Sequence, residues 1–167
     1  MKTKYCITFA GVPGSSKSPI AHHLGWNLGL PLFTNDTLRT EVKEDLLEFN
    51  QQEYEQRRDD RSIALMDGGK PFIYDASVDR AWGTHAERLR ERGYEFFIIS
   101  LDLSQELLGE IYEAKGYEEF AQLSERQPEH DAFLQTYSHL VGLHIGDSEF
   151  PRRLELSLDA VRTWIAQ

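Results

Sequence analysis

The sequence predicts an α/β fold, a three-layer sandwich in which a five-stranded parallel sheet of order 2-3-1-4-5 carries helices on both faces and a small lid. Short apolar segments rich in strand formers alternate with segments whose apolar residues recur at helical spacing. Residues 94–101 are almost wholly apolar, which is typical of a central parallel strand buried on both faces. Strands that alternate with helices form parallel sheets with right-handed crossovers.

The N-terminal half is expected to contain two strand-helix units. Residues 5–10 form the first strand, and the shorter apolar segment 30–33 forms the second. After the second helix, residues 51–61 are almost wholly polar, and their interleaved acids and arginines indicate a solvated helix. The buried faces of the first two helices are marked by Ile20, Ala21, Leu24 and Leu28, and by Leu38, Val42 and Leu46.

The third strand is expected over residues 72–74, ended by Asp75, and the fourth over 94–101. Between them a glycine pair at 68–69 precedes the third strand, and Gly93 ends the intervening helix. That helix has its buried face marked by Trp82, Ala86 and Leu89.

The remaining chain is expected to hold two helices, a fifth strand and a terminal helix. Ser104 is the predicted N-cap of one helix, and Pro128 is placed in the first turn of the next. The segment 116–127 between them is expected to be mobile, and the short alternating run 154–156 is assigned to the fifth strand. The second helix carries Phe133, Tyr137, Leu140 and Val141, and the terminal helix carries Val161, Trp164 and Ile165.

Length and composition favour one domain over residues 1–167, since 40% hydrophobic residues suffice for one core. The net charge of −10 argues against long nucleic acid as a partner. Cys6 lies in an apolar run and is expected to be a buried, inert thiol in a reducing compartment. Neither a membrane span nor a signal peptide is recognisable, so we expect a cytoplasmic monomer or homodimer that has no membrane partner.

Residues 11–18, Gly-Val-Pro-Gly-Ser-Ser-Lys-Ser, follow the first strand and open the first helix. In a phosphate-binding loop at this position, backbone N–H groups and the helix N-terminus bind phosphates. The lysine reaches the terminal phosphates and the next hydroxyl coordinates Mg²⁺. The alternative is a tight strand-to-helix turn that binds nothing. The loop predicts ATP and Mg²⁺ as cofactors, held by Gly11, Gly14, Ser15, Ser16, Lys17 and Ser18, with Ser18 as the metal ligand and Lys17 also catalytic.

Ser16 departs from the usual pattern of such loops, which have glycine before the lysine. A side chain there is expected to crowd the approach of a phosphate. Pro19 is tolerated, because a proline in the first helical turn loses only an N–H that has no partner within the helix.

Two other classes of phosphate-loop protein are argued against by missing motifs. No Asn-Lys-x-Asp sequence is present, which argues against a GTPase switch. The third strand ends Ile73-Tyr74-Asp75-Ala76 instead of Asp-Glu, so the general base of motor-type ATPases is missing.

Three motifs of this sequence resemble those of the small P-loop kinases. They are the loop 11–18, the sequence Asn-Asp-Thr-Leu-Arg at 35–39, and Asp75-Ala76-Ser77 with Arg80. These P-loop NTP hydrolases are typified by the kinase domain of polynucleotide kinase, zeta toxins, and gluconate-kinase-like and shikimate-kinase-like enzymes. The resemblance spans most of the chain. It implies transfer of the ATP γ-phosphoryl group to a hydroxyl of a small-molecule or nucleotide-like acceptor.

Asp36 follows the second strand, at the rim where ligands of open α/β sheets bind. The resemblance implies that Asp36 is the base for the attacking hydroxyl and that Arg39 orients a substrate anion. The alternative for Asp36 is a helix N-cap. Asp75, at the end of the third strand, is expected to hold a Mg²⁺-bound water or a substrate group, or else to cap its loop. The resemblance makes Arg80 a substrate-side arginine, and an exposed surface residue is the alternative.

The lid is where this sequence departs from the family. The resemblance implies two arginines, four residues apart, late in the helix after the fourth strand, but Ile111 and Lys115 stand there. Lys115 keeps one charge, and Arg126 is a second candidate lid cation whose alternative is a merely solvated arginine. The lid is placed around 112–130. Ser16 and Ile111 leave open a nucleotide-binding P-loop protein with weak or no kinase activity, and the charge argues against a polynucleotide 5′-kinase.

Other polar and aromatic residues receive structural interpretations. The adjacent His22 and His23 lack the helical spacing of metal ligands. The arginines of the polar helix, Arg57, Arg58 and Arg61, are assigned to a solvated face. Core anchors are expected at Trp26, Trp82 and Trp164.

Overall fold

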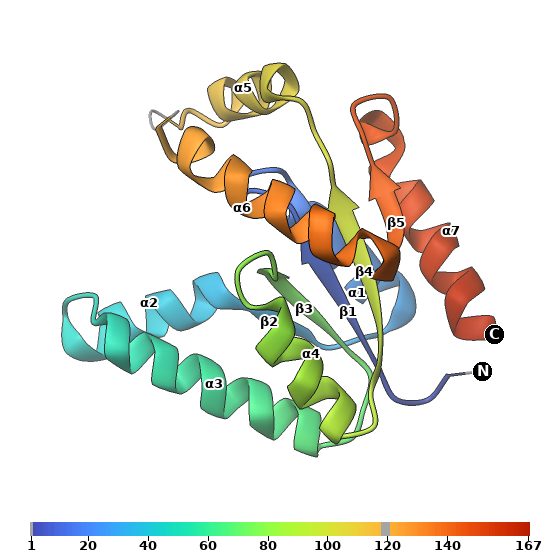
Figure 1. Ribbon diagram of the computed structural model, residues 1–167. Coiled ribbons are helices and arrows are strands. Elements are labelled where there is room, and N and C mark those ends of the chain that lie inside the picture. The colour runs from blue at the N-terminus through green and yellow to red at the C-terminus, as the bar shows by residue number, and fades with distance from the viewer. Residues whose placement is uncertain (1, 118–120) are drawn as a thin grey trace.

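The computed structural model describes residues 2–117 and 121–167 and contains a five-stranded, all-parallel sheet (Figure 1). The strand order is β2-β3-β1-β4-β5, which confirms the predicted α/β class and topology. β1 lies between β3 and β4, and its carboxyl end leads into the loop 11–18. The strands are β1 (Tyr5–Ala10), β2 (Leu32–Thr34), β3 (Phe72–Ser77), β4 (Glu95–Leu101) and β5 (Val141–Ile145).

Helices connect the strands. Ser104 is the N-cap of α5 as predicted, because its hydroxyl accepts the Leu107 N–H at 3.1 Å. Within the described ranges 2–117 and 121–167, no helix has the length and apolarity needed to cross a membrane. The helices are α1 (Lys17–Leu28), α2 (Asn35–Leu46), α3 (Gln51–Asp67), α4 (Trp82–Glu91), α5 (Gln105–Ala114), α6 (Ala121–Tyr137) and α7 (Arg153–Ala166), with short 3₁₀ turns η1 (Ser138–Leu140) and η2 (Phe150–Arg152).

Two apolar clusters cover the two faces of the sheet, because alternate residues of β1 point in opposite directions. Ile7 and Phe9 pack with residues of α1, α5 and α7. Cys6 and Ala10 pack on the other face with residues of α2, α3, α4 and α6. Burial raises the pKa of the Cys6 thiol far above its ordinary range, so the thiol is inert, as predicted.

The assignment of the fifth strand to 154–156 is wrong. Those residues lie in α7, where Leu154 packs beside the core at helical spacing from Leu158 and Val161. The true strand, β5, reads Val-Gly-Leu-His-Ile, an edge strand whose glycine and histidine weaken its apolar signal. Gly142 is required there, since a Cβ would lie 2.3 Å from the Phe97 ring.

The helix at Pro128 begins earlier than predicted. α6 starts at Ala121, so Pro128 lies inside the helix and residues 121–127 belong to it, although a mobile segment was expected there. The predicted lid, 112–130, spans the end of α5 and much of α6, and its residues 118–120 lie outside the described part of the chain.

The helical face predicted for this helix extends too far along the chain. Leu140 lies in η1 and Val141 lies in β5, so neither belongs to α6. Burial of Phe133 fixes the remaining helical face.

The expectation for tryptophan holds at two of three positions. Trp82 is fully buried and Trp164 packs beside the core. Trp26 is 89% exposed, because the buried face of α1 is set by Ala21 and Leu24 and position 26 points away from it.

Candidate active site

The loop 11–18 joins β1 to α1 in the geometry of a phosphate-binding loop. Gly14 has a φ of +80°, and a Cβ there would lie 2.7 Å from the Tyr112 ring. Tyr112 also donates its hydroxyl to the Pro13 carbonyl. The end of α5 therefore packs directly against the loop.

Ser16, the residue that departs from the usual pattern, has a φ of 70° and is 8% exposed. Residues other than glycine adopt this left-handed conformation at a cost of about 1–2 kcal/mol. The preference for glycine before the lysine is thus a backbone requirement, which this chain meets with a strained serine.

Lys17 is buried inside the loop. Its ammonium donates to the Gly11 carbonyl at 2.8 Å, the Val12 carbonyl at 2.6 Å and the Ser15 hydroxyl at 3.1 Å. Burial lowers the pKa of Lys17 to about 8, and the charges of two nearby carboxylates limit the shift. The Lys17 ammonium, at the N-terminus of α1, therefore largely keeps its charge at neutral pH.

Ser18 and Asp75 meet at the rim of the loop. Their side chains lie close enough for the Ser18 hydroxyl to act on the Asp75 carboxylate. Burial raises the pKa of Asp75, while the Ser18 hydroxyl and the Lys17 charge oppose the rise. Asp36 lies close enough to Asp75 for its charge to add to that rise. The structure thus brings together four of the predicted site residues.

Asp36 is the second residue of α2, and the N-cap position is occupied by Thr34. The capping alternative for Asp36 is therefore wrong. Thr34 pairs in register with Asp75 of the neighbouring strand, which explains why the two carboxylates share one rim. Asp36 is exposed, as a base that meets an incoming hydroxyl must be.

A cavity of about 480 Å³ opens beside this rim, between α2, α3 and α4. Arg39 lines it, with its guanidinium 4.8 Å from the Tyr54 ring centroid. Arg58, assigned to a solvated face, also lines the cavity, whereas Arg57 and Arg61 pair with acids on the outside of the helices. The assignment of Arg58 is thus wrong, because a helical register cannot reveal which neighbour a side chain faces.

Asp59 holds two of the cavity's arginines in place. Its carboxylate accepts two hydrogen bonds from Arg58, at 2.9 and 3.0 Å, and one from Arg88, at 3.0 Å. Burial raises the pKa of Asp59, but these guanidinium groups outweigh it and the net shift is downward, so the carboxylate stays ionised. Sequence reasoning missed Arg88, which lies 29 residues from Asp59.

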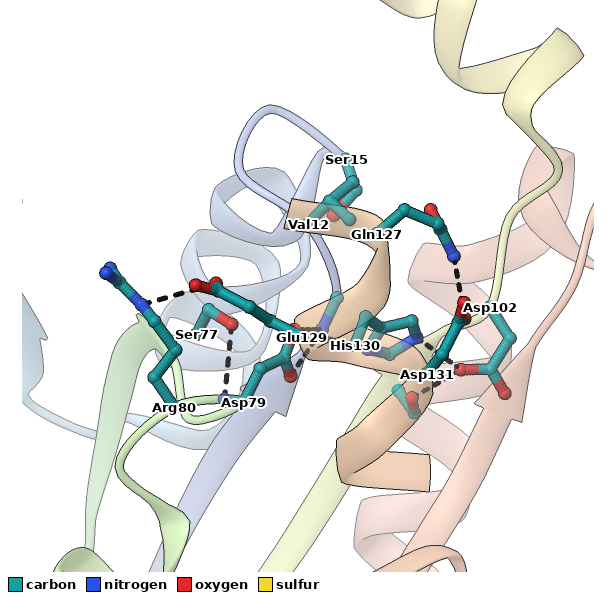
Figure 2. A network of polar contacts seen from close by, with 12 residues as sticks. Val12, Ser15, Ser77, Asp79, Arg80, Asp102, Gln127, Glu129, His130 and Asp131 are labelled. Atoms are coloured by element: carbon teal, nitrogen blue, oxygen red, sulfur yellow. Dashed lines mark hydrogen bonds and ion pairs between the residues drawn. The ribbon is translucent and has the colours of Figure 1, made fainter. Parts of the chain in front are cut away.

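Arg80 and Arg126 both contact Glu129 of α6. The Arg80 Nε lies 3.4 Å from one Glu129 oxygen, and Arg126 donates to the other at 2.8 Å. Arg80 therefore joins the loop before α4 to α6, whereas the Arg126 contact lies within α6 (Figure 2 shows Arg80 with Glu129).

The lid position Lys115 contacts the phosphate loop, since its ammonium donates to the Gly14 carbonyl at 2.7 Å. Burial, with a smaller contribution from Arg153, lowers the pKa of Lys115. Ile111 belongs to the apolar core, where an unpaired charge would be costly to bury.

A buried polar network underlies the site and was not predicted. His130 lies between Asp79 and Asp102, and Asp79 accepts the Gly11 N–H (Figure 2). Asp102 follows β4 directly, at the strand end where site residues gather, and this position was the one available signal in the sequence.

No protein-family model matches the chain, and no curated protein matches it. Among solved structures, a candidate kinase from Chloroflexus aurantiacus j-10-fl superposes with a TM-score of 0.65 at 20% identity, covering 99% of this chain and 98% of that one. The tunicamycin resistance protein of Deinococcus radiodurans gives 0.66 at 14% identity, covering 96% and 95%. The APS kinase of Mycobacterium tuberculosis, solved in complex with AMPPNP and APS, gives 0.58 at 18% identity, covering 97% and 99%.

These likenesses show that the chain has the fold of the small P-loop kinases over nearly its whole length. The loop 11–18 follows the first strand and opens the first helix, which is the position expected of a phosphate-binding loop.

Proposed function

We propose that this protein is an ATP-dependent kinase that transfers the γ-phosphoryl group to a hydroxyl of a small-molecule or nucleotide-like acceptor. The observation that carries the proposal is the grouping of Lys17, Ser18, Asp75 and Asp36 at one rim, beside the arginine-lined cavity. The APS kinase complex, which holds an ATP analogue and an acceptor on the same fold, supports it. The buried Cys6 thiol fits a reducing compartment, as expected of an ATP-consuming enzyme. We propose one cytoplasmic domain that acts as a monomer or a homodimer.

Mg²⁺ fits the residues present. The Ser18 hydroxyl and the Asp75 carboxylate are oxygen donors of the kind that this ion prefers, and they lie close to each other. Bound there, the ion would neutralise charge on the β- and γ-phosphates.

The chain's own residues would then perform the transfer. The loop amides and Lys17 bind and orient the triphosphate, with phosphate oxygens taking the place of the loop carbonyls around the ammonium. Asp36 accepts the proton of the acceptor hydroxyl as its oxygen bonds to the γ-phosphorus and the bond to the bridging oxygen breaks, leaving ADP. Lys115 lies beside Gly14, where it can balance charge on the moving group.

The charge of the cavity favours an acceptor with an anionic group. Four arginines line it against two acids, in a chain whose net charge is −10. Burial and the Arg88 charge keep His85 neutral by lowering its pKa to about 4. The cationic residues are Arg39, Arg58, Arg80 and Arg88, and the acids are Glu55 and Asp59.

A screen of hydroxyl compounds with and without carboxylate or phosphate groups, using γ-labelled ATP, tests the proposal. We expect transfer to an anionic compound, and a loss of two or more orders of magnitude in Asp36→Asn, with ATP affinity kept. Asp45→Asn, on the same helix and away from the cavity, is the matched control. Full transfer by Asp36→Asn would remove the base assignment.

A second candidate is a nucleotide-binding protein with weak or no transfer activity. The strained Ser16 and the apolar Ile111 favour it. ATP binding without transfer to any compound in the screen is the result that would select it.

A further inference from the structure

The His130 imidazole contacts two carboxylates that come from distant parts of the chain (Figure 2). Its Nδ1 lies 3.2 Å from an Asp79 oxygen, and its Nε2 lies 3.1 Å from an Asp102 oxygen. A neutral imidazole has a single N–H, so it would set a nitrogen lone pair against one of these carboxylates. Hydrogen bonds to both therefore require the imidazolium.

The carboxylates that contact His130 come from two segments outside α6. Asp79 comes from the loop after β3, and Asp102 follows β4 and also contacts His144 of β5 and the Ser100 hydroxyl. His130 is 2% exposed. Burial lowers the pKa of His130, but the hydrogen bonds and charges of the two carboxylates outweigh it and raise the pKa to about 9.

Asp79 joins this histidine to the phosphate loop. Its two oxygens lie 3.1 and 3.2 Å from the Gly11 N–H, the first amide of the loop. The Asp79 charge also favours the charged form of Lys17 more than any other neighbour does. One carboxylate thus touches His130 directly and acts on two residues of the loop.

His130 is one of the few attachments of α6. Among the described side chains of this helix, residues 125–137, only His130 and Phe133 are buried. Arg126 lies four residues before His130, on the same helical face, and Glu129 precedes it by one. The polar contact at His130 is therefore the buried anchor next to Glu129, which contacts the cavity residue Arg80 and pairs with Arg126.

We infer that His130 is a positioning residue, which as an imidazolium fastens α6 to the start of the phosphate loop and so holds Glu129, with its partner Arg126, against the cavity residue Arg80. Only the consequence for ATP rests on the proposed function. The clamp formed by His130, Asp79 and Asp102 can be tested on the free protein.

Hydrogen exchange of His130→Gln tests the clamp, with His139→Gln, in the exposed η1 turn, as the matched control. We expect the amides of Gly11 and of residues 125–130 to exchange at least about tenfold faster in His130→Gln and to stay unchanged in the control. The amides of α7 should exchange at the wild-type rate in both variants. Unchanged protection of Gly11 in a folded His130→Gln would overturn the inference.

Titration of the wild-type imidazole by nitrogen NMR decides the question even where the variant fails to fold. We expect both ring nitrogens of His130 to stay protonated at pH 8, with a midpoint near 9, and protection of Gly11 to fall as pH rises through that midpoint. A merely structural histidine would give no such coupled loss. A midpoint at or below the ordinary value of 6.5 would contradict the clamp.

Calorimetry with Mg-ATP separates this inference from the proposed function. If the wild type binds ATP, His130→Gln should bind it roughly tenfold more weakly, since misplaced loop groups lose orientation. Equal affinity in the two proteins would contradict the link to the site. If the wild type binds no ATP, the proposed function fails, while exchange and titration still decide the clamp.

Discussion

The Lys115 ammonium donates a hydrogen bond of 2.7 Å to the Gly14 carbonyl, which ties the end of α5 to the phosphate loop. Of the two predicted lid positions, 111 and 115, only Lys115 is charged, because Ile111 is apolar and belongs to the core. The candidate lid cation therefore contacts the loop directly. Its partners change when an anion enters, because a phosphate oxygen competes with a carbonyl for the same donor.

Lys115→Met tests this contact. We expect the affinity for Mg-ATP to fall by about tenfold or more, since one charge-assisted hydrogen bond is worth about 1.5–3 kcal/mol. Calorimetry measures the effect, and Lys70→Met, at an exposed lysine before β3, is the control. Equal affinities in the two variants would exclude Lys115 from the nucleotide site.

Ser16→Gly relieves the left-handed strain in the loop. The free energy of unfolding should rise by about 1 kcal/mol, because glycine adopts a φ near 70° without steric cost. Ser16→Ala is the matched control, since it removes the hydroxyl but keeps the Cβ, and it should bring no stabilisation. Denaturant unfolding compares the three proteins, and equal stability of the glycine and alanine variants would show that no strain is stored there.

Arg58→Ala combined with Arg88→Ala removes the pair held by Asp59. With the acceptor found in the screen, KM for that acceptor should rise by about tenfold or more, while KM for ATP stays unchanged. Arg61→Ala, whose side chain pairs with Glu41 away from the cavity, serves as control. A rise in KM for ATP instead would assign the cavity to the nucleotide.

His85 makes the stability of the fold sensitive to acid. Its pKa is lowered to about 4 from an ordinary 6.5, so the unfolded chain binds a proton across this window that the folded chain does not. Stability should therefore fall as pH drops from about 6.5 to about 4, by up to about 3 kcal/mol. His85→Phe should flatten that part of the curve, unlike His139→Phe, as followed by urea unfolding at each pH. Parallel curves for both variants would contradict the assignment.

The fold was predictable from the sequence because alternating apolar periodicities mark four of the five strands, and a parallel α/β sheet restricts their order. β5 was not predicted, because an edge strand that contains Gly142 and His144 lacks a continuous apolar pattern. α6 was misplaced because Pro128 was assigned to its first turn, whereas the helix begins at Ala121 and contains Pro128 in its interior.

The position of the candidate phosphate loop was predictable because its residues are contiguous in sequence. The arginine pair on Asp59 and the clamp at His130 were not, since Arg88 and Asp59 lie 29 residues apart and His130 and Asp79 lie 51 apart. Only the tertiary fold brings such side chains together.

Calorimetry of Mg-ATP binding to the wild type and to Lys17→Ala tests the central claim most directly. Lys43→Ala, at an exposed lysine of α2, controls for loss of positive charge. We predict that the wild type and Lys43→Ala bind Mg-ATP equally and that Lys17→Ala loses binding, because the Lys17 ammonium is the one that bonds to three groups inside the loop. Absence of binding by the wild type, or wild-type affinity in Lys17→Ala, would contradict a working phosphate site and with it the proposed kinase.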